Sequence, residues 1–463
     1  MTVPYWVQDA IFYQIFPDRF ANGDLSNDPA NIQPWGAPPT IHHFQGGDLR
    51  GIIQKFDYLL DLGITALYLN PIFQATSNHR YNTSDYYKVD DKLGSMLDFH
   101  ALLDLAHRNN VRIILDGVFN HVGRGFFAFN DLLENGEYSA YRDWFHVRHL
   151  PIDAYGPGEA YNYAGWWNYK SLPKLNTKNP QVRAYIMRVA RYWIERGADG
   201  WRLDVPNEID DDDFWAEFRQ VVKGVNRDAY IVGEIWTADP RWVNEKHFDG
   251  LMNYPVKDAL IACLNHQEST EQFAEKVENL FKLYRRENLY AMYVPLDSHD
   301  TARALSLLGG RLDKLKLAFL FIFAYPGAPA LYYGDEIGLE GGNDPDSRRA
   351  FDWDSAHWKG DLRDFLCELI DLRKRRASLR RGDYSRLAVH AHDKWYAFAR
   401  ILGEEKTVVV VNMSENVSHI QVPVKTVWPD GRSVRSLLDN RPFNVENGQI
   451  NITLPPWGGA FLG

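Results

Sequence analysis

The stretch that decides the fold is Gly200-Trp201-Arg202-Leu203-Asp204-Val205. Side chains alternate between the two faces of a β-strand, so Trp201, Leu203 and Val205 share an apolar face while Arg202 and Asp204 share a charged one. Two interpretations of the charged face are open. The first is an internal ion pair, which is weak grounds for stability because desolvating two charges costs free energy. The second is a carboxylate that the arginine keeps ionised as a nucleophile.

Similar strands recur along the rest of the chain. Eight strands separated by helices predict an α/β fold in which a parallel sheet closes into a (β/α)8 TIM barrel. An open doubly wound sheet is the alternative, but no Gly-x-Gly-x-x-Gly turn follows the first strand. The strand-like runs cover residues 10–16, 64–69, 111–115, 200–205, 229–232, 248–252, 289–296 and 328–333, and helix-like segments between them include residues 96–109, 182–196, 212–222, 270–286 and 312–323.

Two segments do not fit the barrel pattern. Residues 122–176 are rich in Tyr, Trp, Gly and Pro, and long irregular segments in compact folds are usually functional. After residue 378, short β-type runs are separated by Asn, Gly and Pro, as in an antiparallel β-sandwich. We therefore expect a barrel domain of residues 1–121 and 177–378, an inserted subdomain of residues 122–176 after strand three, and a C-terminal β-sandwich of residues 379–463.

The composition disfavours several kinds of partner. The net charge of the 463 residues is −10, without a long basic run, so nucleic acid and anionic membranes are not expected as partners. No segment is apolar for the roughly 20 residues of a membrane span, and the N-terminus lacks a signal-peptide pattern. Cys263 and Cys367 fit free thiols in a reducing compartment, so a cytoplasmic location is expected. The 15 Trp and 25 Tyr fit either an aromatic core or sugar-binding surfaces.

Acidic residues follow four of the predicted strands. The third strand leads to Asp116, the fourth to Asp204, the fifth to Glu234 and the seventh to Asp300. The carboxyl ends of the strands of such a barrel meet at one face, where barrel enzymes carry out their chemistry. Four structural carboxylates at that face would each need a compensating partner, so the arrangement favours a catalytic site.

These segments, in order along the chain, resemble the short motifs of glycoside hydrolase family 13, the α-amylase family. Residues 63–71 and 327–336, at the second and eighth strands, add to the resemblance. It implies a retaining hydrolase in which Asp204 is the nucleophile, Glu234 the general acid/base and Asp300 the third acid. This matches the chemistry of retaining glycosidases, in which two carboxylates about 5 Å apart act in turn.

The resemblance also implies a substrate-binding set. His121 and His299 would donate hydrogen bonds to the sugar in the cleavage subsite, Tyr81 would stack beneath that sugar, and Asp344 and Arg348 would hold the next one. Taken singly, each residue has a plain alternative as a structural histidine or part of an ordinary turn. The complete implied set is Tyr81, His121, Arg202, His299, Trp236, Asn207, Glu208, Asp344 and Arg348.

One loop after the first strand offers oxygen ligands of the kind that calcium prefers. Its pattern resembles the calcium loop of cyclodextrin-acting relatives, and a solvated Asn/Asp turn is the alternative. We expect a structural Ca²⁺ there and no cofactor for catalysis, since two carboxylates and water suffice. The candidate ligands are Asn22, Asp24, Asn27, Asp28, Gly46 and Asp48.

Three stretches, residues 172–176, 205–208 and 252–255, resemble the neopullulanase, cyclomaltodextrinase and maltogenic amylase group. The chain departs from that group's pattern at Leu172, Pro206 and Thr237, which bears on linkage preference and acceptor handling. Members of the group usually carry an N-terminal β-domain before the barrel, whereas here the first predicted strand comes almost at once. We therefore expect a more open active site and a monomer or weak oligomer, a point that light scattering would test.

The expected function is hydrolysis of α-1,4-glucosidic bonds in cyclodextrins, pullulan or maltooligosaccharides and starch, through a glycosyl-enzyme intermediate and with some transglycosylation. A general α-amylase or a glucan transferase is the rival within enzymes. A carbohydrate-binding protein on an inactive amylase barrel is the rival outside them, and the intact Asp204, Glu234 and Asp300 argue against it. The fold alone does not choose between these functions.

Overall fold

The computed structural model of the protein describes residues 3–463; Met1 and Thr2, with which the expected barrel domain begins, lie outside the described residues. Within that range the predicted TIM barrel is confirmed. An eight-stranded parallel sheet forms from β1 (Phe12–Ile15), β2 (Ala66–Leu69), β5 (Arg112–Gly117), β6 (Gly200–Leu203), β7 (Tyr230–Gly233), β8 (Gly250–Leu251), β9 (Tyr293–Pro295) and β10 (Ala328–Tyr332).

The sheet closes on itself. Its strand order is β8-β7-β6-β5-β2-β1-β10-β9, and the two outer strands meet where Met252 pairs with Tyr293. The Asn253 N–H donates to the Tyr293 carbonyl at 2.7 Å across this junction. Strands β1, β2 and β6 are buried at every position, as expected for parallel strands with helices outside and side chains filling the interior.

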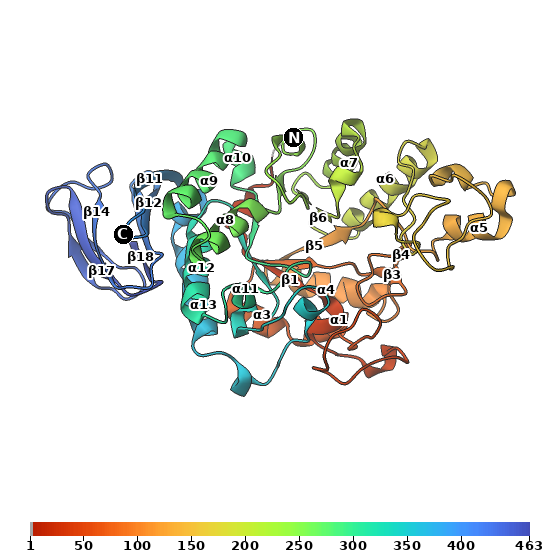
Figure 1. Ribbon diagram of the computed structural model, residues 1–463, viewed down its shortest axis with the longest axis horizontal. Coiled ribbons are helices and arrows are strands. Elements are labelled where there is room, and N and C mark those ends of the chain that lie inside the picture. Colours follow the sequence, from red (N-terminus) through yellow and green to blue (C-terminus); the bar gives the residue numbers. More distant parts are fainter. Residues whose placement is uncertain (1–2) are drawn as a thin grey trace.

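Helices surround the sheet (Figure 1). Ser95 caps α4 in a reciprocal capping box with Asp98, and the side chain of Asp211 caps α7, so polar residues at their first turns fix where these helices begin. The helices of the barrel and its loops are α1 (Pro17–Phe20), α2 (Leu49–Gln54), α3 (Phe56–Leu62), α4 (Met96–Arg108), α6 (Pro180–Glu195), α7 (Asp212–Val225), α8 (Tyr254–Leu264), α9 (Thr270–Leu283), α10 (Arg286–Leu289), α11 (Ala304–Leu307), α12 (Leu312–Ala324) and α13 (Leu362–Arg375).

Several strands are shorter than predicted, among them β8, of which only Gly250–Leu251 remains from residues 248–252, and β9. The run over residues 289–296 begins as the end of α10, because the N–H groups of Leu289 and Tyr290 donate back to the carbonyls of Arg285 and Arg286. Only Tyr293–Pro295 remains as β9. Apolar residues are buried both in the helical part of this run and in its strand, so hydrophobicity alone did not distinguish helix from strand.

The two faces of β6 separate as its alternation predicts. Trp201 is fully buried, and its ring lies 5.5 Å from that of Phe119 and 6.2 Å from that of Phe73. Arg202 belongs to the other parity, on the side of the sheet where Tyr68 lies, with its guanidinium carbon 5.7 Å from the centre of the Tyr68 ring. Apolar packing outside the sheet therefore directs the charged pair of β6 into the barrel.

The chain between β5 and α6 leaves the barrel and forms a mostly irregular segment at one end of the molecule (Figure 1). Backbone pairs between His121 and Lys174 and between Gly165 and Pro173 hold its base together. It contains one helix that the sequence pattern did not predict, α5 (Phe127–Asn135), together with the 3-10 turns η3 (Gly136–Tyr138), η4 (Arg142–Trp144) and η5 (Trp166–Asn168). A short hairpin of β3 (Phe73–Ala75) and β4 (Thr83–Val89) precedes it in the chain.

The C-terminal residues form a separate antiparallel β structure at the opposite end of the molecule (Figure 1), as predicted. Its own apolar cluster includes Val408, Val410, Ile420 and Ile452. Helix α14 (Ala377–Arg381) leads into a four-stranded sheet of β11 (Asp383–His390), β12 (Trp395–Leu402), β13 (Glu405–Asn412) and β18 (Gly459–Leu462), with the pairs β14 (Ser418–Pro423) and β17 (Gln449–Leu454), and β15 (Ser433–Arg435) and β16 (Pro442–Asn444). Of the helices formed by residues 3–463, none is both long and apolar enough to span a membrane.

Candidate active site

Arg202 gathers three carboxylates at the carboxyl end of the barrel. Its guanidinium is 1% exposed and donates from Nη1 to Asp116 Oδ1 at 2.7 Å and to Asp204 Oδ1 at 3.0 Å. Nη2 of the same group lies 3.0 Å from Glu234 Oε2. The ends of three neighbouring strands, β5, β6 and β7, thus bring their acidic side chains to one buried cation.

The proton of this buried cluster belongs on Glu234. Burial raises the pKa of Glu234 to about 7, although Arg202 opposes the rise. Burial also raises the pKa of Asp204, and there Arg202 is again the main opposing charge. Of these two acids, Asp204 accepts a well-aligned hydrogen bond from Arg202, whereas the contact of Arg202 with Glu234 is an ion pair without that alignment. The charged form is therefore favoured on Asp204 and the neutral form on Glu234.

The backbone after β6 also positions Glu234. Val205 has φ 35° and ψ 50°, a left-handed conformation that is strained for a β-branched residue and costs about 1–3 kcal/mol. In this conformation its N–H donates to Glu234 Oε2 at 3.0 Å. Oε2 is thereby occupied as an acceptor, so the proton of Glu234 resides on Oε1.

His299 follows β9 and is fully buried. Its Nδ1 lies 2.9 Å from Gln14 Nε2, and its Nε2 lies 3.0 Å from Asp300 Oδ2. The Gln14 amide nitrogen can only donate, so Nδ1 accepts and the ring proton is assigned to Nε2 from this network. Burial, assisted by Arg348, lowers the pKa of His299 well below its usual value. A neutral imidazole therefore directs an N–H toward Asp300, whose other oxygen lies 3.3 Å from Arg348 Nη2.

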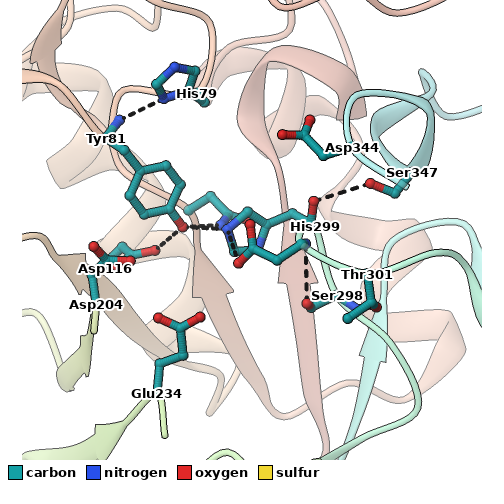
Figure 2. Close-up of polar contacts among 12 residues, drawn as sticks. His79, Tyr81, Asp116, Asp204, Glu234, Ser298, His299, Thr301, Asp344 and Ser347 are labelled. Carbon is teal, nitrogen blue, oxygen red and sulfur yellow. Dashed lines mark hydrogen bonds and ion pairs between the residues drawn. The ribbon is translucent and has the colours of Figure 1, made fainter. Parts of the chain in front are cut away.

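Tyr81 joins the two groups of residues (Figure 2). Its hydroxyl donates to Asp116 Oδ2 at 2.8 Å and lies 2.5 Å from His299 Nε2. The Tyr81 ring is parallel to the His299 ring, with centroids 5.4 Å apart and 3° between the planes. Asn70 Nδ2 donates to the same hydroxyl at 3.0 Å. The tyrosine is thus held on three sides, and its position is fixed before any ligand arrives.

His121 follows β5 on the side of the inserted segment. It is 1% exposed and stacks on Trp166 with centroids 5.2 Å apart. Burial, with the nearby charge of Lys174, lowers its pKa to about 3. Asn120 Nδ2 lies 3.2 Å from its Nδ1, so Nε2 carries the proton and has no partner among residues 3–463. This donor remains available to a hydroxyl of a ligand.

The remaining predicted residues lie further out. Trp236, 42% exposed, stacks on Tyr254 with centroids 4.1 Å apart. Asp344 pairs with Arg348 at 3.0 Å, and its side chain is 40% exposed. Both Asn207 and Glu208 are exposed on η6 (Pro206–Glu208). Glu208 forms an ion pair with Lys174 of the inserted segment at 2.8 Å.

Three residues of this site received no role from the sequence. Asp116 was recognised as a strand end, but its part as an acceptor for Arg202, Tyr68 and Tyr81 depends on side chains from other strands. Gln14 and Asn70 bond each other at 2.9 Å and hold His299 and Tyr81. The only available signals were one polar residue inside the otherwise apolar β1, Gln14, and one directly after the apolar β2, Asn70.

The loop expected to bind calcium has its polar groups close together. Asn22 Nδ2 donates to Asp28 Oδ1 at 2.8 Å, and a Cβ on Gly46 would lie 2.5 Å from the same oxygen. The Oδ1 atoms of Asn22 and Asn27 are buried without a partner in the described chain. Two of the predicted ligands are engaged elsewhere: Asp48 caps α2 and accepts from Gly51 N–H at 2.6 Å, and Asp24 accepts from Ser26 N–H at 3.0 Å. Two orphaned amide oxygens beside a carboxylate fit an oxygen-binding cation.

The loop lacks one common feature of metal sites. Nowhere in residues 3–463 do three or more His, Cys, Asp or Glu side chains converge on a common metal position. Any ion in this loop therefore depends on the two asparagine amides and on main-chain oxygens in addition to the carboxylates.

Comparison with known proteins agrees with this geometry. Residues 14–365 match the family model of the alpha amylase catalytic domain, and residues 384–460 match that of the neopullulanase-like C-terminal domain. A cyclomaltodextrinase of Geobacillus thermopakistaniensis is 42% identical over 98% of this chain and 77% of its own length. Neopullulanase 2 of Thermoactinomyces vulgaris is also 42% identical, over 100% of this chain and 78% of its own length.

A solved structure extends the comparison to the fold. The cyclic α-maltosyl-(1→6)-maltose hydrolase of Arthrobacter globiformis, in complex with that cyclic sugar, superimposes with a TM-score of 0.91 at 38% identity, and each chain covers 100% of the other.

The barrel and its cluster of carboxylates define a glycoside hydrolase, and the chain belongs to the α-amylase family. Within that family it is an α-glucan hydrolase of the kind represented by cyclomaltodextrinases and neopullulanases. The predicted family and enzyme class are thereby confirmed.

Proposed function

We propose that the enzyme hydrolyses α-1,4-glucosidic bonds in cyclodextrins, pullulan or maltooligosaccharides, with retention of configuration. The observation that carries this proposal is the contact of one buried guanidinium with both Asp204 and Glu234. Two carboxylates that share one cation lie close together, in keeping with the spacing of about 5 Å that retaining enzymes need.

In the first step, Asp204 attacks the anomeric carbon. Its Oδ1 is bonded to Arg202, which leaves Oδ2 as the attacking oxygen. The bond from the anomeric carbon to the glycosidic oxygen breaks, and Glu234 transfers its proton from Oε1 to that oxygen. The products are the shortened glucan and a glycosyl ester of Asp204.

In the second step, water replaces the departed glucan. Glu234, now ionised, accepts a proton from water while the water oxygen bonds to the anomeric carbon and the ester bond to Asp204 breaks. A sugar hydroxyl in place of water gives transglycosylation. Trp236 and η6, with Asn207 and Glu208, lie beside the strand ends that carry the two acids and would bind that acceptor.

The sugar in the cleavage subsite is held by the neutral groups around the acids. The unpartnered Nε2–H of His121 donates to a hydroxyl of this sugar. The Nε2–H of His299, which points at Asp300 in the free protein, donates to another hydroxyl once Asp300 turns to accept from the sugar, and Tyr81 stacks below the ring. Arg348 and Asp344 bind the following sugar. Each of these roles can be tested by substituting the one residue concerned.

A direct test replaces Asp204 by Ala. Release of reducing sugar from maltoheptaose should fall at least about a thousandfold, because the nucleophile is lost. Asp213→Asn, which changes an exposed acid on α7, should leave the rate unchanged. Equal rates for Asp204→Ala and the parent protein would contradict the proposal and favour a binding protein. Proton NMR should show the α-anomer as the first product, and an initial β-anomer would exclude retention.

A second substrate class is suggested by the Arthrobacter globiformis hydrolase, which acts on a cyclic sugar with α-1,6 bonds and whose chain matches this one along its whole length. Chromatography of the products from cyclodextrin, pullulan, starch and that cyclic tetrasaccharide ranks the candidates. Starch as the fastest substrate would point to a general α-amylase, and products longer than the substrate to a glucan transferase.

We further propose that Ca²⁺ binds the loop of Asn22, Asn27, Asp28 and Gly46. The ion would fix the loop between α1 and α2 and would take no part in bond cleavage. Calcium at 100 times its dissociation constant should raise the free energy of unfolding by about 2.7 kcal/mol. Asn22→Ala should abolish this increase, whereas Asn130→Ala, on the exposed face of α5, should retain it. A melting temperature that does not respond to calcium or to a chelator would refute the site.

A further inference from the structure

The inserted segment carries an aromatic stack that begins at the active site. Trp166 lies parallel to His121, with centroids 5.2 Å apart and 18° between the planes. Trp167 lies parallel to Trp166, with centroids 4.6 Å apart and 12° between the planes. The second indole is 71% exposed. A bulky apolar ring is therefore presented to solvent, with Trp166 between it and His121 of the cleavage subsite.

The backbone holds Trp167 in this exposed position at a cost. Its φ is 47° and its ψ 31°, and the next residue, Asn168, has φ 61°. Left-handed conformations are uncommon for residues other than glycine, and for bulky side chains they are outliers that concentrate at ligand sites. Hydrogen bonds fix the turn from both sides, from Trp166 N–H to the Leu172 carbonyl at 2.9 Å and from Ala160 N–H to the Asn168 carbonyl at 2.8 Å.

Neither packing nor solvation explains this arrangement. A tryptophan normally buries most of its surface, and the apolar cluster beneath the segment already contains Phe129, Phe145 and Tyr163. A residue with a small polar side chain would occupy the left-handed position with less strain. The flat face of an exposed indole suits a ligand that has an apolar face and polar edges.

We propose that the outer face of Trp167 is a sugar-binding platform for a glucosyl unit outside the cleavage subsite. This inference rests on the proposed function, because the glucan bound at His121 is what brings a further unit to the stack. The C–H face of the pyranose packs on the indole, while its hydroxyls remain in water. The platform gives the enzyme a preference for oligosaccharides long enough to reach Trp167.

The contribution of Trp167 to binding is isolated in a variant that binds the glucan but cannot hydrolyse it. Isothermal titration calorimetry measures the affinity of the Glu234→Gln protein for maltoheptaose. The same measurement is made on Glu234→Gln proteins that also carry Trp167→Ala, Trp167→Phe or Trp167→Leu. Truncation to Ala should weaken binding about fivefold to tenfold, the value of one aromatic stacking contact. Phe should restore most of the affinity, and Leu should not, although both fill space. The loss for maltotriose should be smaller than the loss for maltoheptaose.

Tyr138→Ala provides the matched control, since Tyr138 is 86% exposed in the same segment on η3. Its affinity should equal that of the parent protein. Three results would overturn the platform. The first is equal maltoheptaose affinity with and without Trp167→Ala, and the second is an equal loss of affinity for maltotriose and maltoheptaose. The third is no binding of maltoheptaose to the Glu234→Gln protein. Reducing-sugar release by the unmodified enzyme separately decides the proposed function, so the two can fail independently.

Discussion

At the scale of single residues, Arg202 organises the active site. One buried guanidinium contacts Asp116, Asp204 and Glu234. Its charge opposes the effect of burial on both Asp204 and Glu234, and hydrogen-bond alignment then distinguishes them. The ion pair that β6 carries is thus better understood as part of the chemistry than as a stabilising interaction.

The protonation of Glu234 gives a prediction for activity. A general acid must be protonated, and burial raises the pKa of Glu234 to about 7. The value of kcat/KM should therefore fall as the pH rises through about 7, approaching a tenfold loss per pH unit. A pH profile of maltoheptaose hydrolysis, at pH values where the fold is intact, measures this limb. A constant kcat/KM up to pH 9 would contradict the assignment.

The same shift predicts a stability effect of known sign. The pKa of Glu234 is higher in the folded state than its ordinary value of 4.5, so the folded protein binds the proton more tightly. The free energy of unfolding should therefore decline as the pH rises from about 4.5 to about 7, by up to about 1.4 kcal/mol per pH unit from this group. Glu234→Gln should show a shallower decline in urea unfolding, and an unchanged slope would refute the shift.

Gln14 is predicted to set the tautomer of His299. Gln14→Leu removes the donor to Nδ1 and leaves that nitrogen and Asn70 Oδ1 buried without their present partner. A loss of about 1–3 kcal/mol in transition-state binding, roughly tenfold to a hundredfold in kcat/KM, should follow. Gln421→Leu, which changes an exposed glutamine on β14, is the control. Equal kcat/KM for both variants would show that Gln14 has no positioning role.

At the scale of elements, β6 is aimed by its apolar face. Trp201 is fully buried beside Phe119 and Phe73, which determines that Arg202 points inward. Trp201→Ala should lower the free energy of unfolding by about 3–5 kcal/mol in urea denaturation. Trp167→Ala removes an equally large but exposed ring and should change it by less than about 1 kcal/mol. Similar losses for the two variants would contradict this account.

Element boundaries show where sequence patterns suffice. Helix α12 begins at the predicted residue 312 and ends at Ala324, one residue beyond the predicted end, because its long apolar run stops where Pro326 and Gly327 follow. Helix α5 was missed within an aromatic segment whose side chains pack on several sides. The three-residue strand β3 was also missed, because short strands are fixed by their partners more than by their own composition.

At the scale of the whole molecule, the barrel and the C-terminal β structure share a core. The Phe398 ring of β12 lies 5.9 Å from Phe321 of α12. The buried Arg400 donates to the carbonyls of Ala324 and Gly382, which ties β12 to the end of α12 and to the linker before β11. We propose the expected domain limits, residues 1–121 with 177–378, 122–176 and 379–463, as divisions of the chain and not as independent folding units.

This shared core predicts cooperative unfolding. Differential scanning calorimetry should show one transition, and Phe398→Ala should shift that whole transition downward because it removes about 3–5 kcal/mol of core packing. Val417→Ala, at an exposed position before β14, should shift it by much less. Two transitions, of which Phe398→Ala moves only one, would show that the C-terminal part unfolds by itself.

The sequence alone determined the fold class, the order of the barrel strands and the acids Asp116, Asp204, Glu234 and Asp300. It could do so because alternating burial is a local pattern, and because the carboxyl ends of parallel strands meet at one face. Only the tertiary structure decided that Arg202 contacts three of those acids and that Gln14 lies within hydrogen-bonding distance of His299.

Backbone strain is a further feature that only the tertiary structure decided. Val205 and Trp167 adopt left-handed conformations that their residue types disfavour. Local propensity predicts right-handed or extended conformations for both residues. The contacts that compensate for the strain come from residues that the chain brings together only when folded. For Val205 the contact is with Glu234, and for Trp167 the contacts lie within the inserted segment.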